Sequence, residues 1–166
     1  MTKLSRRALD DTDLQILDVL QREGRITNAE LAARINLSPA PCLRRLQRLE
    51  REKVITGYGA RVDPRRVELG LQAFVRVQLE KHDTRTIERF SQRVARWHEV
   101  VACFALSGDL DYLLHVYVAD LDDFSRFLNK VLAAGVADVN SSFVLNIVKQ
   151  GHGLPIPRRA ATTEGT

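Results

Sequence analysis

The chain has 166 residues, 45% hydrophobic and 28% charged, which is typical of a globular protein and argues against wholesale disorder. No apolar run approaches the roughly 20 residues that cross a bilayer, and the N-terminus lacks the apolar core of a signal peptide, so we expect a cytoplasmic protein. The net charge is +4, and residues 1–66 carry the basic excess, with 14 Lys and Arg against 9 Asp and Glu. This distribution favours a polyanionic partner for the first part of the chain.

The first part has the pattern of three short helices. Asp11 or Thr12 can cap the first helix, and Gly24 ends it. Its apolar face consists of Leu14, Leu17 and Leu20. Thr27 and Glu30 have the spacing of a capping box, in which each side chain bonds the other residue's amide, so a second helix begins there.

A third, basic helix is predicted from Ser38 to Arg51. Ser38 is its expected N-cap, and Pro39 fits the first position, where a missing N–H costs nothing. The expected apolar stripe is Leu43, Leu46 and Leu49, and the residues pointing elsewhere are Arg44, Arg45, Gln47, Arg48 and Arg51. After Lys53, residues 54–64 have the pattern of two short strands with glycines at the turn.

A helix, a short break and a basic helix are typical of a helix-turn-helix, and the strand pair would be its wing. DNA recognition requires a helix that enters the major groove with its N-terminus first and donors for phosphates and base edges. Small residues at the helix start allow close approach. The candidate DNA-binding residues are Ser38, Pro39, Ala40, Pro41, Arg44, Arg45, Gln47 and Arg48. The alternative from spacing alone is a basic, solvated helix in a small bundle.

The second part changes to alternating strands and helices. In chain order we expect strand 73–80, helix 87–97, strand 100–106, turn 107–111, strand 112–118, helix 121–131 and strand 139–149. The order β-α-β-β-α-β is the ferredoxin-like arrangement. The predicted fold class is therefore α+β, with a winged helix-turn-helix over 8–63, a linker over 64–70, a ferredoxin-like domain over 71–150 and a flexible tail over 151–166.

The strand at 112–118 is apolar at both odd and even positions except His115. Two helices cover only one face of a four-stranded sheet, so something else must cover the other face, and a sheet from a second subunit is the natural candidate. His115 is therefore interpreted as a packed or interface histidine. A metal ligand would need a second His, Cys or carboxylate at ligand spacing, and none lies there.

Several sequence blocks together form a specific pattern. In the first part they are Asp13–Leu17, Gly24–Ile26, Asn28–Ala32, Leu37–Leu46, Leu49–Glu50 and Val54–Tyr58. In the second part they are Ser107–Tyr112, with the pattern Ser-Gly-Asp-x-Asp-Tyr, and Ser142–Leu145. Through these blocks the sequence closely resembles the Lrp/AsnC family of leucine- and asparagine-responsive regulators. The resemblance spans roughly residues 10–150. It implies that residues 38–48 form the recognition helix, with Cys42 as a small packing residue.

The same resemblance implies an effector site. In the family the loop that corresponds to Ser107–Tyr112 lines a pocket between subunits and binds a small effector, usually an amino acid. Assemblies of the family are often tetramers or octamers. The implied effector-binding residues are Ser107, Gly108, Asp109, Asp111 and Tyr112. Amides near Gly108 could serve a ligand carboxylate, and Asp109 or Asp111 its ammonium group. On turn chemistry alone, a simple hairpin turn is the favoured interpretation of this loop.

The predicted function is that of a sequence-specific, DNA-binding transcription regulator that responds to a small effector such as an amino acid. Its expected partners are double-stranded DNA, the effector and further copies of itself, without membrane, cofactor or metal. Two alternatives remain open: an amino-acid-sensing module whose first domain contacts protein, and a hydrolase using Cys103 or Cys42 with His115. Only the residue types support the hydrolase, so we predict that the protein is not an enzyme.

Overall fold

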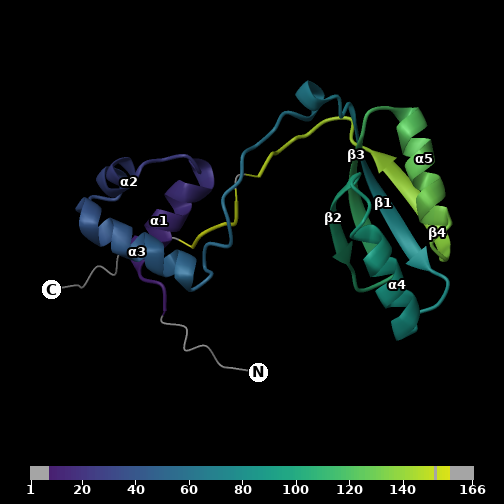
Figure 1. Ribbon diagram of the computed structural model, residues 1–166, viewed down its shortest axis with the longest axis horizontal. Helices are drawn as coiled ribbons and strands as arrows, with labels where there is room; N and C mark the ends of the chain where they lie inside the picture. Colours follow the sequence, from purple (N-terminus) through teal and green to yellow (C-terminus); the bar gives the residue numbers. More distant parts are fainter. Residues whose placement is uncertain (1–7, 152, 158–166) are drawn as a thin grey trace. The chain divides into compact units, whose positions relative to one another are not determined.

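The computed structural model describes residues 8–151 and 153–157 (Figure 1). These residues form two compact units. The first unit contains the chain up to Arg61 and again from Lys149 onward, and the second unit is Val62–Val148. The chain therefore leaves the first unit, builds the second and returns to the first.

The first unit is built from three helices, α1 (Asp11–Arg22), α2 (Asn28–Arg34) and α3 (Pro39–Arg51). The predicted capping box begins α2: the amide of Glu30 donates to Thr27 Oγ1 at 3.2 Å, and the amide of Thr27 donates to Glu30 Oε2 at 2.8 Å. The N-cap of α1 is Asp10, one residue before the predicted choice, because Asp10 forms its own capping box with Asp13.

Ser38 is the N-cap of α3, as predicted, although its side chain makes no capping hydrogen bond. The buried core of this unit is Ile16, Leu31, Ala32, Ile35, Cys42 and Leu49. Cys42 is thus a packing residue. Leu43, which the sequence assigned to the apolar stripe, is 41% exposed. The two neighbours lie about 100° apart on a helix, and Cys42 occupies the core-facing position.

The strand pair predicted over residues 54–64 is wrong, because this segment contains no strand. Most of its side chains are exposed, and an isolated two-stranded ribbon is marginal in water without a covering element. The segment packs through Ile55 against the core and through Tyr58, whose hydroxyl donates to Glu50 Oε1 at 2.7 Å. Burial and this carboxylate raise the pKa of Tyr58 to about 12.

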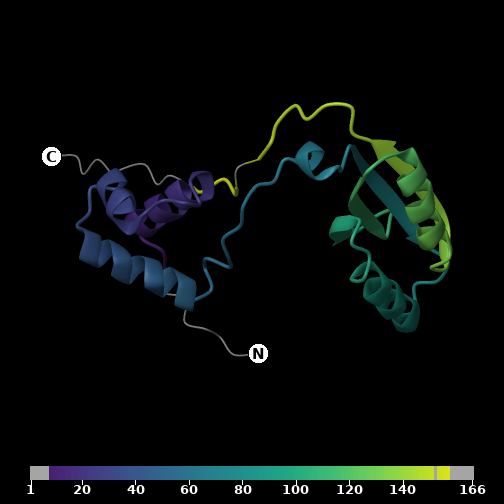
Figure 2. The same cartoon turned by 45° about the horizontal axis from the view of Figure 1, so that its top comes forward.

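The second unit is a four-stranded antiparallel sheet with two helices (Figures 1 and 2). A short 3-10 helix, Pro64–Val67, precedes it. Its elements are β1 (Leu71–Leu79), α4 (Thr84–Val94), β2 (Val100–Ala105), β3 (Tyr112–Val118), α5 (Leu121–Leu132) and β4 (Val136–Phe143). The strand order β2-β3-β1-β4 confirms the ferredoxin-like prediction. Strand β4 begins three residues earlier and ends six residues earlier than the predicted strand 139–149.

Both helices pack on one face of this sheet. The buried side chains there come from alternate positions of β1 and β3 and from both helices, and include Val75, Val77, Leu114, Val116, Phe90, Phe127 and Val131. Trp97 packs edge-on against two phenylalanines of this core. Its ring centroid lies 6.0 Å from that of Phe90 and 5.7 Å from that of Phe127.

The opposite face of the sheet, which we call the open face, has an aromatic and apolar centre with polar side chains of β1 and β4 beside it. Its central side chains are Phe74, Phe104, Leu113, His115 and Tyr117. His115 stacks on Phe74 with ring centroids 4.7 Å apart, and its Nε2 lies 2.7 Å from Gln72 Nε2. Burial lowers the pKa of His115. The prediction that β3 is apolar on both faces is therefore confirmed.

Part of the C-terminal segment docks on α1. The Gln21 side-chain amide donates to the Leu154 carbonyl at 3.1 Å, and the Leu154 amide donates to Gln21 Oε1 at 2.6 Å. Gly153 lies directly on the same side chain with φ of +149°, so an added Cβ would collide with Gln21. This position therefore requires glycine.

We predict that Gly153→Ala detaches the segment from α1. A loss of about 1 kcal/mol in docking would raise its undocked population about fivefold. Limited trypsin digestion, followed by mass spectrometry of cleavage after Lys149, measures that opening. The matched control is Gly151→Ala, because a Cβ at Gly151 meets nothing within 4 Å. Equal cleavage of the two variants would contradict the docking role of Gly153.

Candidate functional site

One side of α3 faces away from the core and forms the candidate DNA-binding surface. Cys42, Leu46 and Leu49 point toward the core, and the residues about half a turn away are exposed. We call these residues the outer ridge: Ala40, Arg44, Gln47 and Arg51. The sequence-based set contained three of them and omitted Arg51. Ser38 and Pro39 are exposed at the start of the helix, and Pro41 is half-buried.

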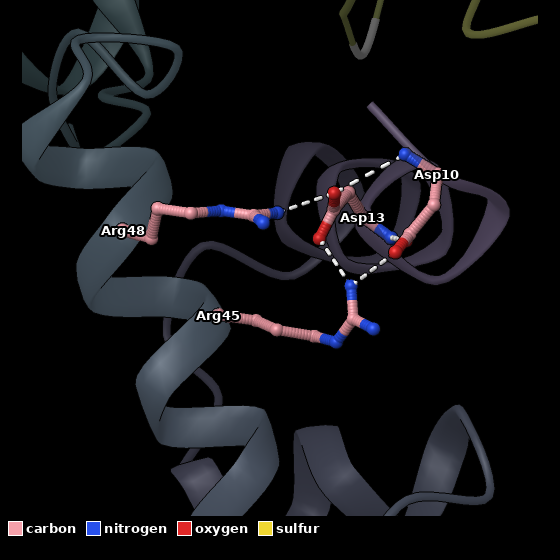
Figure 3. Close-up of polar contacts among 4 residues, drawn as sticks. All are labelled: Asp10, Asp13, Arg45 and Arg48. Atoms are coloured by element: carbon pink, nitrogen blue, oxygen red, sulfur yellow. Dashed lines mark hydrogen bonds and ion pairs between the residues drawn. The ribbon is translucent and has the colours of Figure 1, made fainter. Parts of the chain in front are cut away.

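Arg45 and Arg48 lie on the flank of α3 that faces α1. Figure 3 shows both guanidinium groups reaching two aspartates at the start of α1. Arg45 Nη1 is 2.6 Å from Asp10 Oδ2 and 2.8 Å from Asp13 Oδ1, and Arg48 Nη2 bonds Asp13 Oδ2. The exposure predicted for Arg48 is wrong, because its side chain is only 20% exposed.

Asp13 is the centre of this cluster. Its side chain is 1% exposed, and both carboxylate oxygens bind a guanidinium group of α3. The amide of Asp10 also donates to Asp13 Oδ2, at 3.2 Å. A buried carboxylate is costly unless it is paired and hydrogen-bonded, so the two arginines offset the burial of Asp13. The cluster fixes α3 against α1.

The electrostatics of the neighbouring groups agree with this pairing. Burial alone would raise the pKa of Asp10, but the hydrogen bonds from Arg45 and from the Asp13 amide lower it overall. The hydrogen bonds to Asp10 and Asp13 raise the pKa of Arg45 in turn. All of these shifts favour the charged forms of the cluster.

The loop between β2 and β3 divides the predicted effector residues into two groups. Ser107, Gly108 and Asp109 are exposed, and Gly108 adopts φ of +109°. Tyr112 is instead buried on the helix-covered face, with its ring centroid 4.8 Å from that of Phe90. Tyr112 therefore packs in the core beneath the loop.

Asp111 anchors the loop to the end of β1. Its Oδ2 accepts the Leu79 amide at 2.7 Å, and its Oδ1 lies 2.8 Å from His82 Nε2. Its own amide donates to the Val77 carbonyl at 3.1 Å. These bonds leave Asp109 as the loop carboxylate that faces solvent. The contact of His82 with Asp111 could not be predicted from the sequence, because no local pattern links residues that lie 29 positions apart.

The geometry does not support a thiol hydrolase. Cys42 lies in the core of the first unit, whereas His115 lies in the second. Cys103 pairs with Leu114 in the sheet, so it faces the helices, and His115 faces the open side. Burial raises the pKa of both thiols, the reverse of what a nucleophilic thiolate requires.

The part of the chain that the structure describes contains no group of three or more His, Cys, Asp or Glu side chains suited to a metal ion. No helix in it is both long enough and apolar enough to cross a membrane.

Comparison with protein families matches both units. Residues 9–56 match a winged helix-turn-helix DNA-binding model, and residues 72–154 match the Lrp/AsnC ligand binding domain. The leucine-responsive regulatory proteins of Escherichia coli K12 and Klebsiella pneumoniae are each 39% identical over 153 residues, covering 91% of this chain and 93% of theirs.

Solved structures agree. A transcriptional regulator from Neisseria meningitidis in complex with L-Met superimposes with a TM-score of 0.85 and 47% identity, over 89% of this chain and 97% of that one. An AsnC family regulator from Agrobacterium tumefaciens superimposes with a TM-score of 0.84 and 35% identity, over 89% of this chain and 97% of that one. A feast or famine regulatory protein from M. tuberculosis, complexed with L-methionine, superimposes with a TM-score of 0.79 and 31% identity. The match covers 90% of this chain and 100% of that one.

The helix-turn-helix with its outer ridge and the ferredoxin-like ligand domain together define an effector-responsive, DNA-binding transcription regulator. Within that class, the chain belongs to the Lrp/AsnC family.

The cluster predicts different stability effects for two arginines one turn apart on α3. Arg48→Ala should lower the free energy of unfolding by about 2–4 kcal/mol, because Asp13 loses one of its two cationic partners. Arg44→Ala should change it by less than about 0.5 kcal/mol, because Arg44 is exposed. Urea titration followed by circular dichroism measures both. Equal, small effects would show that Arg48 has no structural role.

Proposed function

We propose that the outer ridge of α3 contacts the major groove of double-stranded DNA and that Arg44 and Arg51 supply its cationic donors. The single observation that supports this assignment is the division of the arginines of α3. Arg45 and Arg48 are bound to aspartates of α1, whereas Arg44 and Arg51 are exposed on the side opposite the core. Gln47 lies between them with an amide suited to a base edge. The protein would act where its DNA lies, in the cytoplasm.

Arg44→Ala is predicted to weaken DNA binding by about 1–3 kcal/mol if Arg44 contacts a base. The loss should depend on sequence, and a phosphate contact would instead reduce the salt dependence for every sequence. Binding is measured by gel shift on a duplex selected by the parent protein from a random-sequence pool. Arg126→Ala removes the same charge from α5 and serves as the control. If the parent binds no duplex, the alternative of a first unit that contacts protein is favoured.

For the effector, we propose an α-amino acid bound at the β2–β3 loop. Two similar regulators were solved with methionine, which makes L-methionine the first ligand to test. Asp109 would accept the ammonium group, and amides near Gly108 would donate to the carboxylate. Asp111 would hold the loop in place through Leu79 and His82.

Asp109→Ala should weaken binding of L-methionine, or of whichever amino acid the parent binds, by about 10- to 100-fold, the value of one hydrogen bond to a charged group. DNA affinity without ligand and thermal stability should stay unchanged, because Asp109 is exposed and lies in the second unit. Isothermal titration calorimetry measures the loss. Asp122→Ala is the control, since Asp122 is exposed in the first turn of α5. An unchanged affinity of Asp109→Ala for the amino acid would show that the loop is only a hairpin turn.

We propose that the open face of the sheet is covered by the same face of a second copy. The aromatic and apolar side chains at the centre of this face are typical of an interface, and a two-fold symmetric dimer is the commonest way to cover them. Two first units in one dimer would then read half-sites about one helical turn, or a multiple of it, apart.

His115 should make this assembly weaker in acid. Burial lowers its pKa from 6.5, so the folded state holds the imidazole neutral while the unfolded state takes up a proton. The stabilisation is complete above pH 6.5 and is lost as the pH falls toward the lower folded pKa. Sedimentation velocity and thermal unfolding between about pH 7.5 and 5.5 should show this decline in the parent and a shallower one in His115→Gln. His98→Gln is the control, because His98 is exposed. Identical pH profiles in all three would exclude His115 as the titrating group.

A further inference from the structure

The recognition helix carries four arginines, Arg44, Arg45, Arg48 and Arg51, but two of them are already occupied by carboxylates of the first unit. We propose that Asp13 is a specificity-determining residue: by holding Arg45 and Arg48, it withholds two cations from the DNA backbone. This inference rests on the proposed DNA-binding role of α3.

The geometry gives Asp13 this role over Asp10. Asp13 is the only carboxylate of the pair that binds both guanidinium groups, one with each oxygen. It is almost fully buried, whereas Asp10 is about half exposed and binds Arg45 alone. The two arginine side chains retain 30% and 20% of their exposure, so they reach the surface beside the outer ridge.

Phosphate contacts add affinity for every sequence, while base contacts discriminate among sequences. Each arginine that reaches a phosphate therefore raises specific and non-specific binding together. On this helix, the residues left to contact DNA are the outer ridge, with its amide at Gln47 flanked by Arg44 and Arg51. Holding back two further cations keeps the ratio of specific to non-specific affinity high.

The test is Asp13→Asn, which keeps the shape and removes the charge. Its affinity for a scrambled duplex should rise, and its plot of log affinity against log salt should steepen by about 1 to 2, since each new phosphate contact contributes about 0.9. The affinity ratio between the selected duplex and the scrambled duplex should fall. A purely structural role for Asp13 predicts otherwise: both affinities fall together and the salt slope stays at the parent's value.

Two further variants complete the experiment. Asp18→Asn changes the net charge equally on the same helix, but Asp18 pairs with Arg22 of α1, so its salt slope should match the parent's. Asp10→Asn removes one partner of Arg45 while asparagine still caps α1, and should steepen the slope by about 1. It also tests the proposal if Asp13→Asn fails to fold.

The outcomes distinguish a failure of the proposed DNA-binding function from a failure of the role proposed for Asp13. A parent that binds no duplex contradicts the proposed function. A parent that binds DNA, with salt slopes and affinity ratios identical in the parent, Asp10→Asn and every folded Asp13 variant, overturns the role of Asp13 alone. Steeper slopes in Asp18→Asn as well would assign the effect to net charge and would also overturn it.

Discussion

The carboxylate of Asp13 is almost fully buried, and two guanidinium groups of α3 compensate its charge. A charge in that position ties two helices together more strictly than apolar contact does, because a small displacement leaves it unpaired. That pairing fixes the flank of α3 that faces α1, and it decides which arginines of α3 remain on the outer ridge. The second helix of the motif contributes mainly apolar contacts, through Leu31 and Ala32.

The second unit follows a different constraint. Its strand β3 carries apolar side chains on both faces of the sheet, and the two helices cover only one of those faces. The same strand, β3, therefore supplies the core through Leu114 and Val116 and the open face through Leu113 and His115. The β2–β3 loop leads directly into this strand, with Asp111 bonded to the end of β1. A ligand at the loop and a partner on the open face would thus act on one rigid element.

The features predicted correctly from the sequence depend on neighbours in the chain. The capping box of Thr27 and Glu30, the cap at Ser38 and the alternation of β1 all arise within a few residues. Apart from the cap of α1 and the exposure of Leu43, which are local, the errors involve distant partners. Arg48 was expected to be exposed because nothing in its own helix reveals Asp13, which lies 35 residues away. Residues 54–64 have strand-like composition but form no strand.

The docking of Leu154 on Gln21 also bears on the order in which the protein is made. During synthesis the three helices leave the ribosome first, and the sheet is then completed, before the residues that bond α1 are translated. The second unit is in effect inserted into the first. Fusing a tag after Val148, or cutting the chain there, would therefore disturb the first unit while leaving every strand of the sheet intact.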